Sequence, residues 1–132
     1  MPSPEIEEFA TILVEKVREA SIKSCDRRFQ ANATSPAAKR WKEMARSATP
    51  EEFRKVLIAD IVDEAISSVL YAVDDGLLKI SFSASSGKVV DLNSEGLGEL
   101  AGWYTGSDGW RAMYTKERFV DDVADLKNYF QS

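Results

Sequence analysis

Three carboxylates are spaced so that they could hold a metal ion: Asp60, Asp63 and Glu64. Their i, i+3 and i+4 positions bring them to one side of a helix. Mg²⁺ and Mn²⁺ accept such oxygen ligands without histidine, so the triplet could serve a metal-dependent enzyme. Metal sites usually draw ligands from a second element, and no second acidic motif occurs in the chain. We therefore expect a solvent-facing stripe paired with Arg or Lys of the first two helices, and no bound metal or other cofactor.

The stretch from Gly96 to Trp110 combines aromatic rings with a backbone that glycine makes adaptable. It holds five of the seven glycines and two of the three tryptophans. Rigid rings supply contact area, and glycine lets the backbone approach a ligand closely. Aromatic residues and Arg are enriched at interfaces, although core packing of a tryptophan is an open alternative. The candidate binding residues are Trp103, Tyr104, Asp108, Trp110, Arg111 and Tyr114.

The chain has no histidine. This removes the commonest general base near neutral pH and every Ser-His or Cys-His nucleophile pair. The single cysteine, Cys25, lies in a helical apolar pattern and is expected to be a small buried residue. No catalytic residue is assigned, and the class of non-catalytic binding proteins is favoured.

Charge is distributed unevenly along the chain. The net charge is −5, but residues 23–46 carry seven basic and two acidic residues, a local +5, which leaves −10 for the rest. Phe29 and Trp41 lie within the basic segment, as in some phosphate-binding surfaces. The acidic remainder would repel nucleic acid, so we expect no nucleic acid partner.

Size and composition indicate one domain over residues 1–132, since a 44% hydrophobic chain of this length can form one core. The N-terminus is acidic and does not resemble a signal peptide. No apolar run approaches the ~18 residues that a membrane span requires. We expect a cytoplasmic protein without a membrane partner.

Three helix starts are marked by a hydroxyl residue followed by proline: Ser3, Ser35 and Thr49. Thr49 and Glu52 also have capping-box spacing. The expected helices span residues 4–31, 36–46 and 50–73, with Gly76 stopping the third. Thr115 begins a fourth helix that turns Phe119, Val123, Leu126 and Phe130 inward.

The first expected helix would be on the order of 40 Å long, which is close to the full breadth of a domain of this size. It must break near residues 21–25 or pack on a second subunit, which predicts a homodimer through this helix. Trp41, Met44 and Ala45 should form the inner face of the second helix. The third helix should be central, with Leu57 and Ile61 buried.

Alternating apolar residues predict strands at 78–83 and 88–93. A three-residue loop with Gly87 in the left-handed region pairs Phe82 with Val90 and Ile80 with Leu92, which buries apolar against apolar. Residues 100–104 and 110–114 form a possible second hairpin. The fold class is thus α+β: three N-terminal helices, a small antiparallel meander of two to four strands and a C-terminal helix.

Three functions fit this composition. The leading interpretation is a cytoplasmic protein-binding domain, such as an inhibitor, adaptor or immunity-type protein, that uses an acidic aromatic C-terminal face. The second is a small-ligand sensor with a pocket near Trp103 and Trp110. The third is the metal-dependent enzyme. A pocket lined by the tryptophans would favour the sensor, and a flat or convex face would favour the protein partner.

Overall fold

The computed structural model describes residues 3–120 and is mostly helical, with one two-stranded antiparallel sheet. The α+β class is therefore confirmed. The elements in chain order are α1 (Pro4–Ile12), the π-helical segment η1 (Leu13–Arg18), α2 (Glu19–Arg27), α3 (Pro36–Ser47), α4 (Pro50–Asp74), β1 (Ser81–Ser83), β2 (Val89–Asp91), α5 (Leu92–Glu95), α6 (Leu100–Thr105) and α7 (Trp110–Tyr114).

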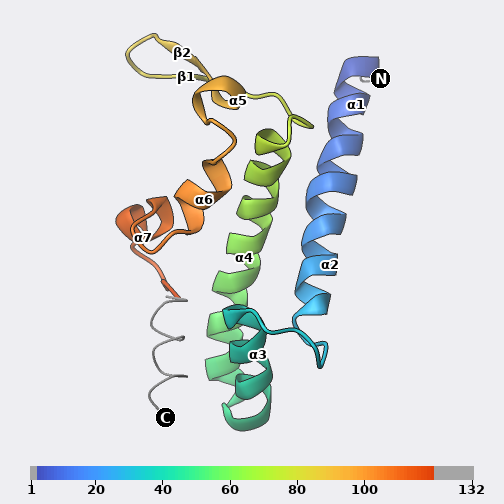
Figure 1. The fold of residues 1–132 in the computed structure, drawn as a ribbon, viewed down its shortest axis with the longest axis vertical. Coiled ribbons are helices and arrows are strands. Elements are labelled where there is room, and N and C mark those ends of the chain that lie inside the picture. Colours follow the sequence, from blue (N-terminus) through green and yellow to red (C-terminus); the bar gives the residue numbers. More distant parts are fainter. Residues whose placement is uncertain (1–2, 121–132) are drawn as a thin grey trace.

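Helix α4 lies at the centre of the fold, as the sequence predicts. α1, η1 and α2 form one continuous rod that runs antiparallel to α4 along one side (Figure 1). α6 and α7 lie on its other side, and α3 packs near its N-terminal end (Figure 1). No helix in the described part of the chain is long and apolar enough to cross a membrane.

The three predicted helix starts are confirmed by their caps. The Ser3 hydroxyl accepts the Ile6 N–H, and the Ser35 hydroxyl accepts the Ala38 N–H. Thr49 begins α4 with a complete capping box, in which Glu52 accepts from the Thr49 backbone. These contacts satisfy N–H groups that have no partner within the helix.

The first helix does not break near residues 21–25. It passes through one π-helical segment, where the Glu19 N–H reaches the Val14 carbonyl, and ends at Arg27 rather than near residue 31. Val17 and Ser21 are buried within the rod. Cys25 is half-buried, and burial raises the pKa of its thiol.

The main apolar core gathers at the C-terminal end of α4. Ala72 and Val73 pack there with Val17 of η1, Leu78 and Leu100. Gly76 ends α4 as predicted, with a φ of 75° that favours glycine. Asn93 holds the next segment, because its amide donates to the carbonyls of Val73 and Leu78.

The first hairpin has the predicted register but shorter strands. Phe82 pairs with Val90, and Gly87 has a φ of 91°. The Leu92 N–H donates to the Ile80 carbonyl just beyond the paired residues. Phe82 is largely exposed, so the expected burial of this apolar pair is not realised.

The predicted second hairpin is wrong, because residues 100–105 and 110–114 form α6 and α7. Both carboxylate oxygens of Asp74 accept N–H groups at the start of α6, from Leu100 and Ala101. The loop to α7 passes so close that a Cβ on Gly109 would lie 2.3 Å from the Trp103 carbonyl oxygen. Glycine is therefore required there for steric reasons.

The helix expected from Thr115 is absent over residues 115–120, which contain no helix or strand. Thr115 instead caps a local turn by accepting the Glu117 N–H. Phe119 is partly exposed. The other three residues expected to face inward, Val123, Leu126 and Phe130, lie outside the described residues.

Candidate functional site

In the middle of α4 the polar face points inward and much of the apolar face points outward. Asp60 is 5% exposed, whereas Ile61 is 45% exposed and Val62 is 51% exposed. The expected orientation is therefore wrong: Ile61 does not lie in the core, and the carboxylate triplet is not a solvent stripe. Leu57 is half-buried.

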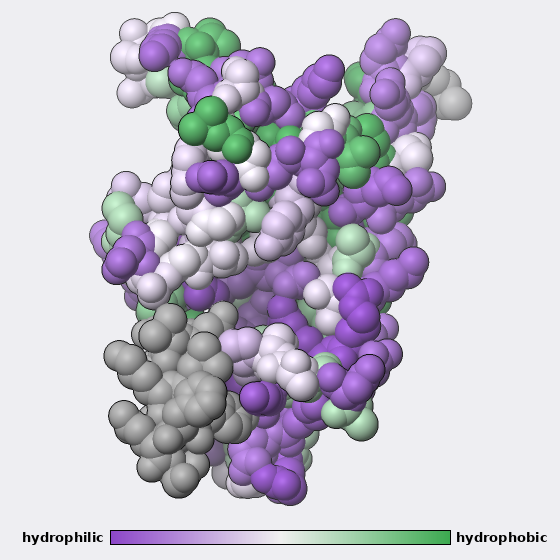
Figure 2. Space-filling model, in the orientation of Figure 1, coloured by the Kyte–Doolittle hydropathy of each residue, from purple (hydrophilic) through white to green (hydrophobic). Residues whose placement is uncertain are grey.

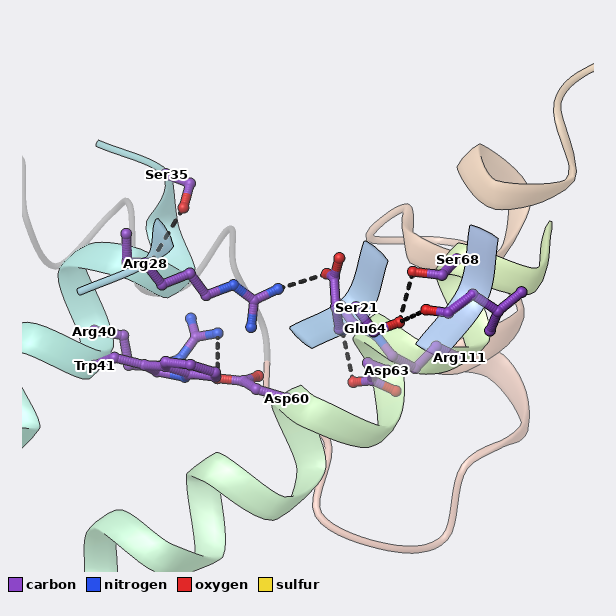
Figure 3. Close-up of polar contacts among 12 residues, drawn as sticks. Ser21, Arg28, Ser35, Arg40, Trp41, Asp60, Asp63, Glu64, Ser68 and Arg111 are labelled. Atoms are coloured by element: carbon purple, nitrogen blue, oxygen red, sulfur yellow. Dashed lines mark hydrogen bonds and ion pairs between the residues drawn. The ribbon is translucent and has the colours of Figure 1, made fainter. Parts of the chain in front are cut away.

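Asp60 joins α3 to α4 through a buried ion pair. One carboxylate oxygen accepts from Arg40 Nη2 at 2.9 Å and from Trp41 Nε1 at 2.6 Å (Figure 3). Arg40 and Trp41 are both almost fully buried. The sequence predicted that three residues of α3 face inward. Trp41 is confirmed and Met44 is half-buried, but Ala45 is exposed, so the prediction for Ala45 is wrong.

Glu64 and Ser68 join α4 to the rod. Glu64 accepts from Arg28 Nη2 at 2.6 Å, and Ser21 donates to Ser68 at 2.8 Å (Figure 3). The Arg28 guanidinium also lies 4.6 Å from the Trp41 ring centroid, within cation–π range. Two cations of the basic segment, Arg28 and Arg40, therefore bind carboxylates within the fold. Lys42 donates to the carbonyls of residues 30 and 33, which fixes the loop before α3.

Asp63 joins α4 to α6 and α7. It accepts from the Tyr104 hydroxyl at 2.7 Å and from Arg111 Nη1 at 2.9 Å. Burial, together with the hydrogen bond to Asp63, raises the pKa of Tyr104 to about 12, so its hydroxyl remains a donor throughout the neutral range. Arg111 Nε is buried without a hydrogen-bond partner in the described part of the chain.

Each carboxylate of the triplet is thus bound to an arginine. The expected pairing with the first two predicted helices is confirmed for Asp60, which binds Arg40, and for Glu64, which binds Arg28. It is wrong for Asp63, which binds Arg111 of α7. Over residues 3–120, no group of three or more Cys, Asp or Glu side chains could hold a metal ion. The triplet acts as a set of links between helices.

A groove of about 750 Å³ lies between α4 and α7, and we name it the α4–α7 groove. α4 contributes Ile58, Val62 and Asp63 to its wall. The opposite wall is formed by Tyr104, Trp110, Arg111 and Tyr114. Phe119, which follows α7 in the chain, also lines the groove. The lining also includes Glu117 and Arg118, so among residues 3–120 its acidic and basic residues are equal in number.

Four of the six candidate binding residues meet in this groove: Tyr104, Trp110, Arg111 and Tyr114. Trp103 packs against the main core instead, with its ring centroid 5.9 Å from that of Trp110. Asp108 is exposed in the loop between α6 and α7 and does not line the groove. Trp103 therefore belongs to the core, whereas Trp110 lines the groove.

Sequence reasoning missed the α4 wall of the groove. The signal was present, because the apolar residues of this helix cover more than one stripe and some of them must face away from the core. The sequence did not indicate which stripe would remain exposed. Comparison of the chain with protein families, curated proteins and solved structures finds no match.

Proposed function

We propose that this chain is a non-catalytic, cytoplasmic protein-binding domain, and that the α4–α7 groove accepts an apolar side chain from a segment of its partner. The supporting observation is the meeting of exposed apolar residues of α4 with Trp110, Arg111 and Tyr114. Aromatic residues and Arg dominate the energetics of protein interfaces. An inhibitor, adaptor or immunity-type protein would use such a face without performing chemistry.

A small-ligand sensor is the second candidate, because the groove volume falls within the roughly 300–1,000 Å³ of ligand sites. Such sites bury most of the ligand surface. Here the walls are open, since Ile58 is 44% exposed and Trp110 is 36% exposed. Exposed apolar surface also continues along α4 beyond the groove to Ile66, which favours a larger partner. The metal-dependent enzyme receives no support from the arginine-bound carboxylates.

A site-specific crosslinker tests the protein-binding proposal. p-Benzoylphenylalanine is placed at Tyr114, on the groove rim, and the protein is irradiated in the cells that produce it. The control places the same residue at Phe82, another exposed aromatic position, on β1. We expect a protein adduct from position 114 and none of the same mass from position 82. A low-mass adduct would establish the sensor instead, and no adduct would contradict both.

We also propose that two copies of the chain associate through α1. α1 has no buried residue, and its Ile6 and Phe9 are exposed, as is Leu13 at the start of η1. Figure 2 shows the end of α1 projecting from the molecule, with a notch between it and the hairpin. The rod is also unbroken where the sequence required either a break or a second subunit.

Light scattering at micromolar concentration tests this association. We expect twice the mass of one chain for the wild type and for Phe82→Glu, and the mass of one chain for Phe9→Glu. The two substitutions place a charge at similarly exposed phenylalanines, so they separate an interface effect from a general change in charge. A monomeric wild type would contradict the proposal.

A further inference from the structure

Arg111 is the buried polar group of the α4–α7 groove. Its side chain is 10% exposed, and Nη1 is bound to Asp63. The guanidinium carbon lies 5.0 Å from the centroid of the Phe119 ring, which covers it. Nε has no hydrogen-bond partner within residues 3–120. One buried N–H donor beside the groove is therefore left without an acceptor among the described residues.

The charge state of this donor decides which acceptor suits it. Asp63 already neutralises the Arg111 charge. A second carboxylate would be repelled by Asp63 at short range, whereas a neutral carbonyl oxygen carries no such cost. The neighbouring wall consists of apolar and aromatic side chains. The best-matched occupant combines an apolar side chain with an adjacent neutral carbonyl, which is the chemistry of a peptide segment.

We infer that Arg111 Nε donates a hydrogen bond to a backbone carbonyl of the partner segment, next to the side chain that enters the groove. This assignment rests on the proposed function and names the group that fixes the position of the segment. Phe119 belongs to residues 115–120, which form no helix or strand. An aromatic side chain of the partner reaches this position by replacing the Phe119 ring over the guanidinium.

Two probes that share a phenyl ring test the inference by NMR on the full chain. N-acetylphenylalaninamide carries an aromatic ring and peptide carbonyls, and ethylbenzene carries only the ring. The Arg111 Nε–H signal is assigned by its loss in Arg111→Lys, which keeps the charge that binds Asp63. We expect both probes to shift the methyl signals of Ile58 and Val62. Both rings also change the Nε–H shift by replacing the Phe119 ring, but the acetyl amide should move Nε–H further downfield than ethylbenzene does, because it alone supplies a carbonyl acceptor.

Affinity measurements with Arg111→Lys complete the test. We expect the substitution to weaken binding of the acetyl amide about fivefold and to leave ethylbenzene binding nearly unchanged. Equal weakening of binding for both probes, or the same Nε–H shift with both, would overturn the role of Arg111 while leaving the groove in place. If neither probe shifts Ile58 or Val62, the proposed groove function itself fails. The backbone amide spectrum of the variant verifies its fold.

Discussion

Replacing Asp60 by alanine should lower the free energy of unfolding by about 3–5 kcal/mol, as expected when one member of a buried ion pair is removed. Asp60 is 5% exposed and accepts hydrogen bonds from both Arg40 and Trp41. In Asp60→Ala the Trp41 N–H loses its acceptor at a site that water does not reach. Chemical denaturation, with the slope compared between variants, measures the change.

Ile61→Ala is the matched control, because it removes a larger apolar side chain from the adjacent position of the same helix. Ile61 is 45% exposed, so the change should cost less than about 1 kcal/mol. Asp60→Asn keeps one oxygen acceptor for Trp41 and should fall between the two. Similar denaturation midpoints for Asp60→Ala and Ile61→Ala would contradict the inward orientation of the polar face.

The helix starts could be predicted because their causes are local. The caps of Ser3, Ser35 and Thr49 each involve residues within three positions along the chain. The hairpin register was also predictable, since it depends on one turn and on Gly87. In both cases the side chains that decide the structure lie close together in sequence.

The orientation of α4 could not be predicted in this way. Its polar residues face inward because their partners arrive from three other parts of the chain: Arg28 after α2, Arg40 in α3 and Arg111 in α7. The pattern of apolar residues along α4 alone favours the opposite orientation. Only the tertiary arrangement supplies enough buried cations to make the carboxylates the inner face.

The second hairpin was predicted from its glycine-rich turn, but the residues after that turn also have a spacing that is typical of a helix. Trp110, Met113 and Tyr114 follow i, i+3 and i+4, which is the spacing of one helix face. Both segments are short, so periodicity distinguished poorly between a strand and a helix. Asp74 favours α6 by binding its first N–H groups, and this partner is remote in sequence.

One of the two walls of the candidate binding site could be predicted from the sequence. Its aromatic wall follows from residue types in one segment, and four of those six residues line the groove. The wall on α4 depends on which stripe stays exposed, and that choice is made by the same ion pairs that orient the helix. The groove and the buried carboxylate network therefore share one structural cause.

Val62→Asp should weaken the complex with the partner recovered from position 114 by about 100-fold or more. Val62 lies in the groove wall, and a carboxylate there would be covered by the partner's apolar side chain. Of the two arginines that line the groove, Arg111 is bound to Asp63 and Arg118 donates to the Lys55 carbonyl. Burying an unpaired charge costs several kcal/mol, and each 1.4 kcal/mol corresponds to about tenfold in affinity. Titration calorimetry with the purified partner measures the loss.

Ile61→Asp is the control for this experiment. The two positions are adjacent on α4 and similarly exposed, but Ile61 does not line the groove. Both substitutions place the same residue in a helix interior, so their costs to folding should be alike. We expect Ile61→Asp to change the affinity by less than about threefold. Equal losses of affinity would show that the partner covers the exposed face of α4 broadly. Unchanged affinity in both variants would show that the binding surface does not include α4.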